Sequence, residues 1–261
     1  MHQFILSLRS EFYKSRRTLA FWSAVVLPVA ICGLVATGYF VNSHKLINTP
    51  GMLQWLRYMG AIMNVMGILV LPMFIVFLAY SVNNMEHRSE MWKSLFSLPL
   101  NKWSIYGSKY LFAVILNAIC LLLFASLIVG SGTLLGILRP ELKFQDYSIT
   151  AIAYELHLKL FLSSLGILSI QFFLSLIWSD FIRPMGIGFI GTIAGIISTN
   201  AGWDYAYTLP YAHPALALIN NRGTGRIPEV SFLTSETYVS LLVALAAFVG
   251  GYFIVSKRSV K

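Results

Sequence analysis

Six stretches of about 20 mostly apolar residues constrain the fold of this chain more than any other feature of its sequence. They lie at 19–41, 61–82, 110–130, 160–178, 185–203 and 238–255. A helix of about 20 residues crosses a bilayer core of about 30 Å, and it pairs its backbone N–H and C=O groups internally. Only 11% of the 261 residues are charged, whereas soluble domains carry about a quarter. The sequence therefore predicts an all-α membrane protein with six transmembrane helices.

The first 18 residues carry an amphipathic helical pattern. Apolar side chains recur at helical spacing and bases lie among the residues between and after them: Phe4, Ile5, Leu8 and Phe12, with Arg9, Lys14, Arg16 and Arg17. A helix of this kind lies in the headgroup layer of a membrane. No small-residue cleavage site follows the first apolar stretch, so we expect the segment to be retained. The predicted organisation is an interfacial helix over 1–18 and a single transmembrane domain over 19–261.

The distribution of bases predicts the orientation, because Lys and Arg near the ends of spans stay in the cytoplasm. With both termini inside, 12 of the 19 bases are cytoplasmic: Arg9, Lys14, Arg16, Arg17, Arg88, Lys93, Lys102, Lys109, Arg183, Lys257, Arg258 and Lys261. The other seven are spread over longer outer segments. An even number of spans agrees with this count, so we expect both termini in the cytoplasm. Most of the net charge of +9 is then explained by the orientation of the chain in the membrane. The sequence contains no basic soluble segment that could bind nucleic acid.

The longest predicted cytoplasmic connection, 83–109, contains an amphipathic pattern. Met91, Leu95 and Leu98 recur every three or four residues, and Pro99 ends the pattern. Trp92 and four charged residues lie among them: Glu86, Arg88, Glu90 and Lys93. The segment is either a surface helix that joins two spans or a docking helix whose apolar ridge fits a groove on a cytoplasmic partner. We favour docking.

The outer segment 200–237 is too apolar for a simple linker. Its aromatic and aliphatic residues are interrupted by Pro210 and Pro214, so we expect the chain to enter the interface and return without crossing. An interfacial aromatic belt without a transport role is an equal alternative. In the preceding span, Gly188, Gly191 and Gly195 share one helix face. Small residues at this spacing let helices approach closely in lipid, so we expect this face to pack on another helix, within the chain or in a second copy.

Motifs for catalysis or metal binding are missing from the sequence. It contains no Walker lysine motif, no His-Glu-x-x-His and no cysteine pair at zinc spacing. We therefore expect no enzyme activity, no catalytic or metal site, and no cofactor bound by this chain. Cys32 and Cys120 lie in apolar stretches as packing residues. Glu155 and Lys159, four residues apart, predict an ion pair at a helix end.

Three stretches resemble the permease subunits of ABC-2 type exporters, especially those related to lantibiotic and bacteriocin immunity. LRSEFYKSRR at 8–17 is similar to the membrane-surface elbow helix of that family, with Glu11, Phe12, Lys14 and Arg17 at its matching positions. The segment 86–99, followed by Lys109, resembles the family's coupling segment, and LPYAHP at 209–214 resembles its outer re-entrant region.

This resemblance implies a multi-pass protein of the bacterial plasma membrane that exports an antimicrobial peptide, a lantibiotic or another amphipathic compound. ATP and Mg would bind to a separate ABC ATPase subunit, present in two copies, and a second permease subunit, identical or paralogous, would complete the complex. Two alternatives stay open. One is a channel or secondary carrier that works without a partner and depends on Glu155 or Lys159; the other is a structural protein that assembles membrane subunits.

Overall fold

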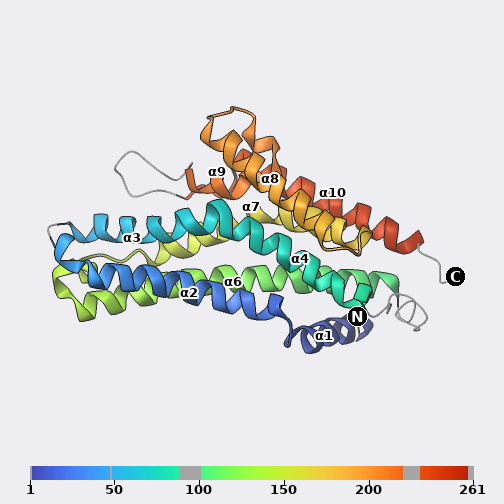
Figure 1. Ribbon diagram of the computed structural model, residues 1–261, viewed down its shortest axis with the longest axis horizontal. Coiled ribbons are helices and arrows are strands. Elements are labelled where there is room, and N and C mark those ends of the chain that lie inside the picture. Colours follow the sequence, from blue (N-terminus) through green and yellow to red (C-terminus); the bar gives the residue numbers. More distant parts are fainter. Residues whose placement is uncertain (1, 48, 89–100, 220–229, 258–261) are drawn as a thin grey trace.

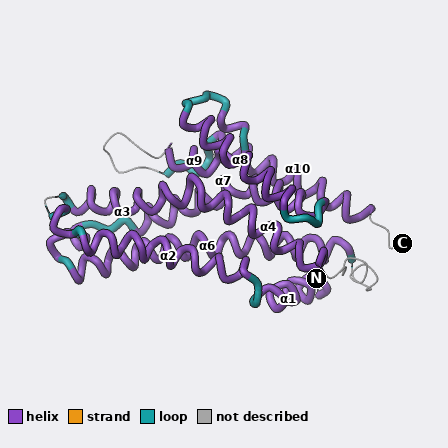
Figure 2. Tube along the Cα trace, viewed as in Figure 1, coloured by secondary structure: helices purple, strands orange, loops and turns teal. Residues whose placement is uncertain are grey.

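The computed structural model describes residues 2–47, 49–88, 101–219 and 230–257, and within these ranges the chain is helical and forms no strand (Figures 1 and 2). The main helices are α1 (His2–Ser15), α2 (Leu19–Val41), α3 (Gly51–Val65), η2 (Met66–Val70), α4 (Leu71–Arg88), α6 (Lys102–Leu138), α7 (Thr150–Ile177), α8 (Ile182–Asn200), α9 (His213–Ile219) and α10 (Ser235–Lys257). Short 3-10 turns are η1 (Ser43–Lys45), η3 (Pro140–Leu142), η4 (Phe144–Asp146), η5 (Ala206–Thr208) and η6 (Pro210–Ala212). In this part of the chain, six helical stretches are long and apolar enough to cross a membrane. The predicted all-α fold with six spans is confirmed.

The spanning helices are mostly longer than the apolar stretches that predicted them. α2 has the predicted bounds, but α6 has 37 residues, about 55 Å at 1.5 Å per residue. Asn101 caps its start, because the side-chain Oδ1 accepts a hydrogen bond from the N–H of Trp103 at 3.0 Å. Its last residue lies just before Arg139 and Pro140. Hydropathy marks the part of a helix that suits lipid, whereas caps and prolines set where the helix ends.

The second span changes its helix type near its middle. α3 leads into the π-helix η2, and α4 follows directly. The N–H of Leu71 bonds to the carbonyl of Met66, five residues earlier. Pro72 has no N–H to donate to Ile68, and its ring would collide with that carbonyl in a regular α-helix. The wider turn at η2 accommodates this proline, so the span has a built-in irregularity where α3 and α4 meet.

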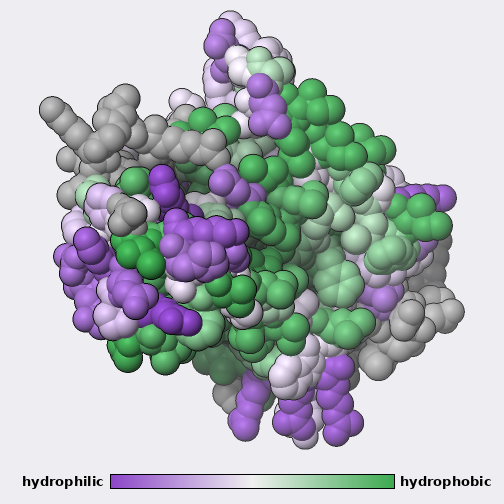
Figure 3. Space-filling model, turned by 60° about the vertical axis from the view of Figure 1, so that its left-hand side comes forward, coloured by the Kyte–Doolittle hydropathy of each residue, from purple (hydrophilic) through white to green (hydrophobic). Residues whose placement is uncertain are grey.

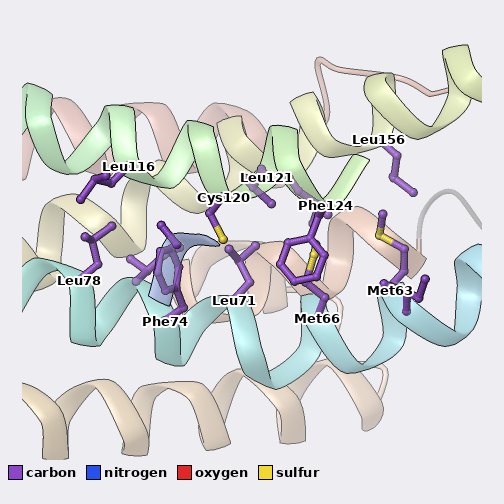
Figure 4. Packing of buried hydrophobic residues seen from close by; sticks show 14 of the residues in the cluster. Met63, Met66, Leu71, Phe74, Leu78, Leu116, Cys120, Leu121, Phe124 and Leu156 are labelled. Atoms are coloured by element: carbon purple, nitrogen blue, oxygen red, sulfur yellow. The ribbon is translucent and has the colours of Figure 1, made fainter. Parts of the chain in front are cut away.

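α7 occupies the centre of the bundle, where it packs on α10, α4 and α6. α2 and α1 both pack on α6. Figure 1 shows α1 and the C-terminal part of α10 toward the same end of the molecule. Close packing of apolar side chains joins the second and third spans: Figure 4 shows Leu71 and Phe74 beside Cys120, and Met66 beside Phe124, all of them buried.

The outward faces of several spans are apolar. A space-filling view shows a broad hydrophobic face with hydrophilic side chains gathered at its margins (Figure 3). Examples of exposed side chains are Leu19, Val26 and Leu34 on α2, Ile190 and Ile197 on α8, and Leu242, Leu245 and Phe253 on α10. Such a surface suits lipid or another membrane helix, and not water.

Candidate functional site

A buried ion pair joins three elements at the end of the bundle that holds α1. The Lys109 ammonium on α6 donates to Glu11 Oε2 on α1 at 3.0 Å and to the carbonyl oxygen of Val82 on α4 at 3.2 Å. Glu11 Oε1 accepts from Lys14 at 2.7 Å. Glu11 and Lys109 are buried. We call Glu11, Lys14, Val82 and Lys109 the inner junction, after the side of the membrane that the sequence predicts for them.

Because it is buried, the ion pair of this junction holds the helices together. A buried charge is tolerated only when it is paired and hydrogen-bonded, so removing one partner leaves the other in an unfavourable state. Uncharged contacts also hold α1 against α6. The hydroxyls of Ser7 and Ser108 lie 2.7 Å apart, and the rings of Phe12 and Phe112 meet edge to face with centroids 4.8 Å apart. α1 is therefore fixed against α6 along its length.

The inner junction lies at the base of the predicted coupling segment. Val82 directly precedes the segment 83–109 and Lys109 is its last residue, so one ammonium holds both of its ends. Asn83, also buried, donates to Ser175 Oγ on α7 at 2.8 Å. Lys102 donates to the carbonyl of Ser256 on α10 at 3.0 Å. A displacement of this segment would therefore act on α1, α4, α6, α7 and α10 together.

The structure locates the predicted coupling residues only in part. Glu86 and Arg88 belong to the last turns of α4. The remaining ones lie outside the described residues: Glu90, Met91, Trp92, Lys93, Leu95 and Leu98. The docking helix therefore stays a prediction, and the structure contributes the geometry of the two ends from which the segment leaves the bundle.

The predicted elbow residues have different surroundings. Glu11 is buried in the inner junction, Phe12 packs on Phe112 of α6, and Lys14 pairs with Glu11. Arg17 is exposed in the turn after α1. The placement of this helix in the headgroup layer stays a prediction. Sequence reasoning missed the pairing of Glu11 with Lys109, although Glu11 is the only acid in a basic helix and Lys109 directly precedes an uncharged span.

The glycines of α8 face different neighbours. Gly188 lies against Val76 of α4 and Gln171 of α7, whereas Gly191 and Gly195 lie against Tyr211 of η6. A Cβ atom on Gly195 would be 2.6 Å from the Tyr211 carbonyl oxygen, and one on Gly191 would be 2.8 Å from its ring. These two glycines therefore make room for a segment of the outer connection rather than for another spanning helix.

That connection folds into a compact unit at 206–219, formed by η5, η6 and α9, which we call the outer wedge after the side of the membrane that the sequence predicts for it. It packs on α7, α8, α10 and η2. With the Gln171 amide oriented to satisfy its neighbours, the side-chain oxygen accepts from the Tyr211 hydroxyl at 2.6 Å. Leu218 lies against Gly67 of the π-helix, where its side chain occupies the space that a Cβ atom would need. Entry of this unit into the membrane stays a prediction, but its buried contacts reach three spans and the irregular turn of the second.

The predicted ion pair between Glu155 and Lys159 is wrong. Glu155 is exposed, while Lys159 is fully buried and its Nζ lies 3.4 Å from Glu236 Oε1 on α10. Spacing of four residues allows a pair along one helix. Here Lys159 lies on the face of α7 that meets α10, and a partner distant in sequence takes the place of the local one.

Titratable residues of the described part of the chain do not gather into a metal site. In the described ranges, no group of three or more His, Cys, Asp or Glu side chains could hold a metal ion. Cys32 and Cys120 are free, buried thiols among apolar neighbours. Among the described residues, the buried ion pairs of Lys109 with Glu11 and of Lys159 with Glu236 each join two helices.

Comparison with known proteins connects this geometry to a family. A family model described as ABC-2 family transporter protein matches residues 7–195. Neither the curated proteins nor the solved structures give a match. The matched range begins in α1 and ends in α8, so it contains the whole inner junction and the predicted coupling segment, whereas the outer wedge and α10 lie beyond it.

Proposed function

The chain belongs to the ABC-2 family of transporter proteins, and on that premise we propose that it is the membrane-spanning permease of an ATP-driven exporter whose motion enters through the inner junction. Permeases of this family are transmembrane components that are not themselves catalytic, and they generally work with an ATPase partner. The six apolar helices and the matched range agree with a multi-pass membrane protein.

The observation that carries the proposal is the position of Lys109. Its ammonium contacts the elements on both sides of the predicted coupling segment, Val82 on α4 and Glu11 on α1. A push that reaches the described ends of that segment would act on α1, α4 and α6 through these contacts. Because these contacts are buried and charge-assisted, they transmit a displacement instead of absorbing it.

In the proposed mechanism, closure of two ATPase subunits tilts the inner ends of the spans. ATP binding needs to favour one packing of the helices over another by only a few kcal/mol to shift their populations. Asn83 and Ser175 extend the movement from α4 to α7, the central helix. Two permease chains, identical or paralogous, would then open an apolar path between them.

The proposed cargo is an amphipathic peptide such as a lantibiotic, or a compound of similar character. α2, α8 and α10 expose many large apolar side chains, and the charges buried in the described helices are paired. A path next to such faces suits a ligand that partitions into lipid better than a hydrated ion.

A partner-independent carrier is the second candidate, and one observation favours it. The buried pair of Lys159 and Glu236 is the kind of intramembrane charge that secondary carriers keep for coupling. The two candidates differ in liposomes that contain the permease alone. A carrier transports there under an ion gradient, whereas the proposed permease does so only with its ATPase and ATP.

The docking step is tested by purification of the complex. We expect the triple variant Trp92→Asp, Leu95→Asp and Leu98→Asp to lose the co-purifying ATPase, because three charges replace the predicted apolar ridge. The matched control places the same three charges on the opposite face of the predicted helix, in Ser89→Asp, Ser94→Asp and Ser97→Asp, and it should retain the partner. Retention by both triple variants would contradict docking at this segment.

A further inference from the structure

Two opposite charges are buried together where α7, α9 and α10 meet. Lys159 has an exposed fraction of 0% and Glu236 of 2%, and Nζ lies 3.4 Å from Oε1. Both belong to helices that are apolar enough to span the membrane. Ionisable residues in such helices are unfavourable unless they are paired, and they commonly mark functional positions.

The pair also faces the outer wedge. His213, the first residue of α9, is completely buried, and its Nε2 lies 2.8 Å from the carbonyl oxygen of Tyr207 in the same wedge. Burial lowers the pKa of His213, and the nearby Glu236 carboxylate acts in the opposite direction. Glu236 therefore interacts with a spanning helix through Lys159 and with the wedge through His213.

Helix adhesion alone does not account for these charges. α7 and α10 already meet closely one turn beyond Glu236, where Ser240 Oγ accepts from the N–H of Gly166 at 2.9 Å and donates to the carbonyl of Ser163 at 2.9 Å. A buried ion pair adds little net stability compared with apolar side chains of the same size. Its distinctive property is that separation exposes two charges that water can solvate, so it suits a contact that opens and closes.

The central helix connects this pair to the inner junction. α7 carries Ser175 near one end, bound to Asn83, and Lys159 toward the other. A rigid-body movement of α7 that begins at its inner end would change the position of Lys159 relative to Glu236. The same movement would act on the wedge, because Tyr211 is bound to Gln171 of α7.

We propose that Lys159 and Glu236 form an ionic lock that holds the outer wedge closed and separates during each export cycle. This inference rests on the proposed function, since it requires an ATP-driven movement of α7. Lys159 and Glu236 are positioning residues in this account. They determine when the wedge can leave its site between α7, α8 and α10, and they need not contact the cargo.

The test uses the complex of the permease with its co-expressed ATPase in proteoliposomes, with Ala217→Cys as a reporter. Ala217 is buried in α9, so a membrane-impermeant maleimide should label the reporter only when the wedge opens. In the otherwise unchanged protein we expect labelling to rise several-fold with ATP. In the variant Lys159→Met, which removes the ammonium from the buried Glu236 carboxylate, we expect the high level without ATP, together with leakage of cargo.

Ser240→Ala is the matched control, because it weakens the same pair of helices without removing a charge. We expect its labelling to keep the dependence on ATP. The chain without the reporter measures background from the two buried native thiols. If Lys159→Met itself fails to fold, Glu236→Asp shortens the carboxylate by one methylene and should raise labelling without ATP to an intermediate level.

The outcomes separate the lock from the proposed function. A complex in which ATP drives export, but whose labelling is the same in Lys159→Met and in the unchanged protein, overturns the lock and leaves the permease assignment intact. A chain that binds no ATPase and exports nothing with ATP overturns the permease assignment. ATP-dependent labelling that becomes ATP-independent in Lys159→Met supports both.

Discussion

The two ion pairs buried in the described ranges differ in how completely their ammonium groups are satisfied. In the inner junction, Glu11 accepts from Lys14 at 2.7 Å and from Lys109 at 3.0 Å, and Lys109 also donates to a backbone carbonyl. In the ionic lock, Lys159 and Glu236 are 3.4 Å apart, and Lys159 Nζ has no hydrogen bond within the described part of the chain. The inner ammonium is part of a hydrogen-bonded network, whereas the outer one has a longer contact with its carboxylate.

This difference distinguishes the inner junction, a contact that stays closed, from the ionic lock, a contact that can open. Charge-assisted hydrogen bonds that satisfy both partners are strong and directional. A buried ammonium without such bonds retains much of its desolvation penalty, and it regains hydration when the pair separates. The inner junction is therefore suited to transmit a movement, and the lock is suited to respond to one.

The largest expected effect comes from breaking the inner junction at Lys109. Lys109→Met leaves the buried Glu11 carboxylate with Lys14 and removes the bond to Val82. We expect a loss of about 3 kcal/mol in unfolding free energy, within the range for a broken buried pair. The melting temperature of the purified protein in detergent measures it, with the unchanged protein as reference.

A second variant shows whether the loss is electrostatic. Glu11→Gln combined with Lys109→Met removes both charges, and we expect it to recover most of the stability but not the coupling of ATP hydrolysis to export. At the lock, the corresponding loss of one charge in Lys159→Met is expected to open the wedge. If the single and double variants were equally unstable, packing rather than charge would hold α1 in place.

The docking site of the outer wedge is tested next, at the glycines of α8. Gly195→Ala places a methyl group 2.6 Å from the backbone oxygen of Tyr211, which cannot rotate away as a side chain would. We expect a loss of about 1–3 kcal/mol from overpacking and higher labelling of the wedge reporter without ATP. Gly186→Ala on the same helix meets nothing within 4 Å and should leave both measurements unchanged.

A smaller effect is expected at the link between α4 and α7. Asn83→Ala removes the hydrogen bond to Ser175 and a weaker one to the carbonyl of Phe172 at 3.3 Å, at about 1 kcal/mol of stability. We expect ATP hydrolysis to continue while the ATP-dependent labelling of the wedge falls. The neighbouring variant Asn84→Ala should keep both. If labelling in Asn83→Ala kept its dependence on ATP, a contact other than this hydrogen bond would carry the movement from α4 to α7.

The sequence predicts the spans of this protein far better than its polar contacts. A span needs only enough consecutive apolar residues, and the local sequence alone shows these. All six spans are therefore predicted, and α2 is predicted to the residue. The pairing of Glu11 with Lys109 joins residues 98 positions apart, and it depends on how α1 packs on α6. For Lys159 the local partner Glu155 is the natural prediction and is wrong, because the orientation of α7 toward α10 is a property of the assembled bundle.

The smallest expected effect is a dependence of the wedge on outside pH, through His213. Burial lowers its pKa below the ordinary value of 6.5, more strongly than Glu236, paired with Lys159, raises it. The docked wedge therefore holds a neutral imidazole, while an undocked one regains the ordinary pKa. Docking is then most stable above pH 6.5 and weakens as the pH falls below it. Labelling of the Ala217→Cys reporter should rise modestly in this acid range, and His213→Gln, which cannot titrate, should abolish the rise. A rise that persists in His213→Gln would assign the pH dependence to another group and leave the lock without a contribution from the wedge histidine.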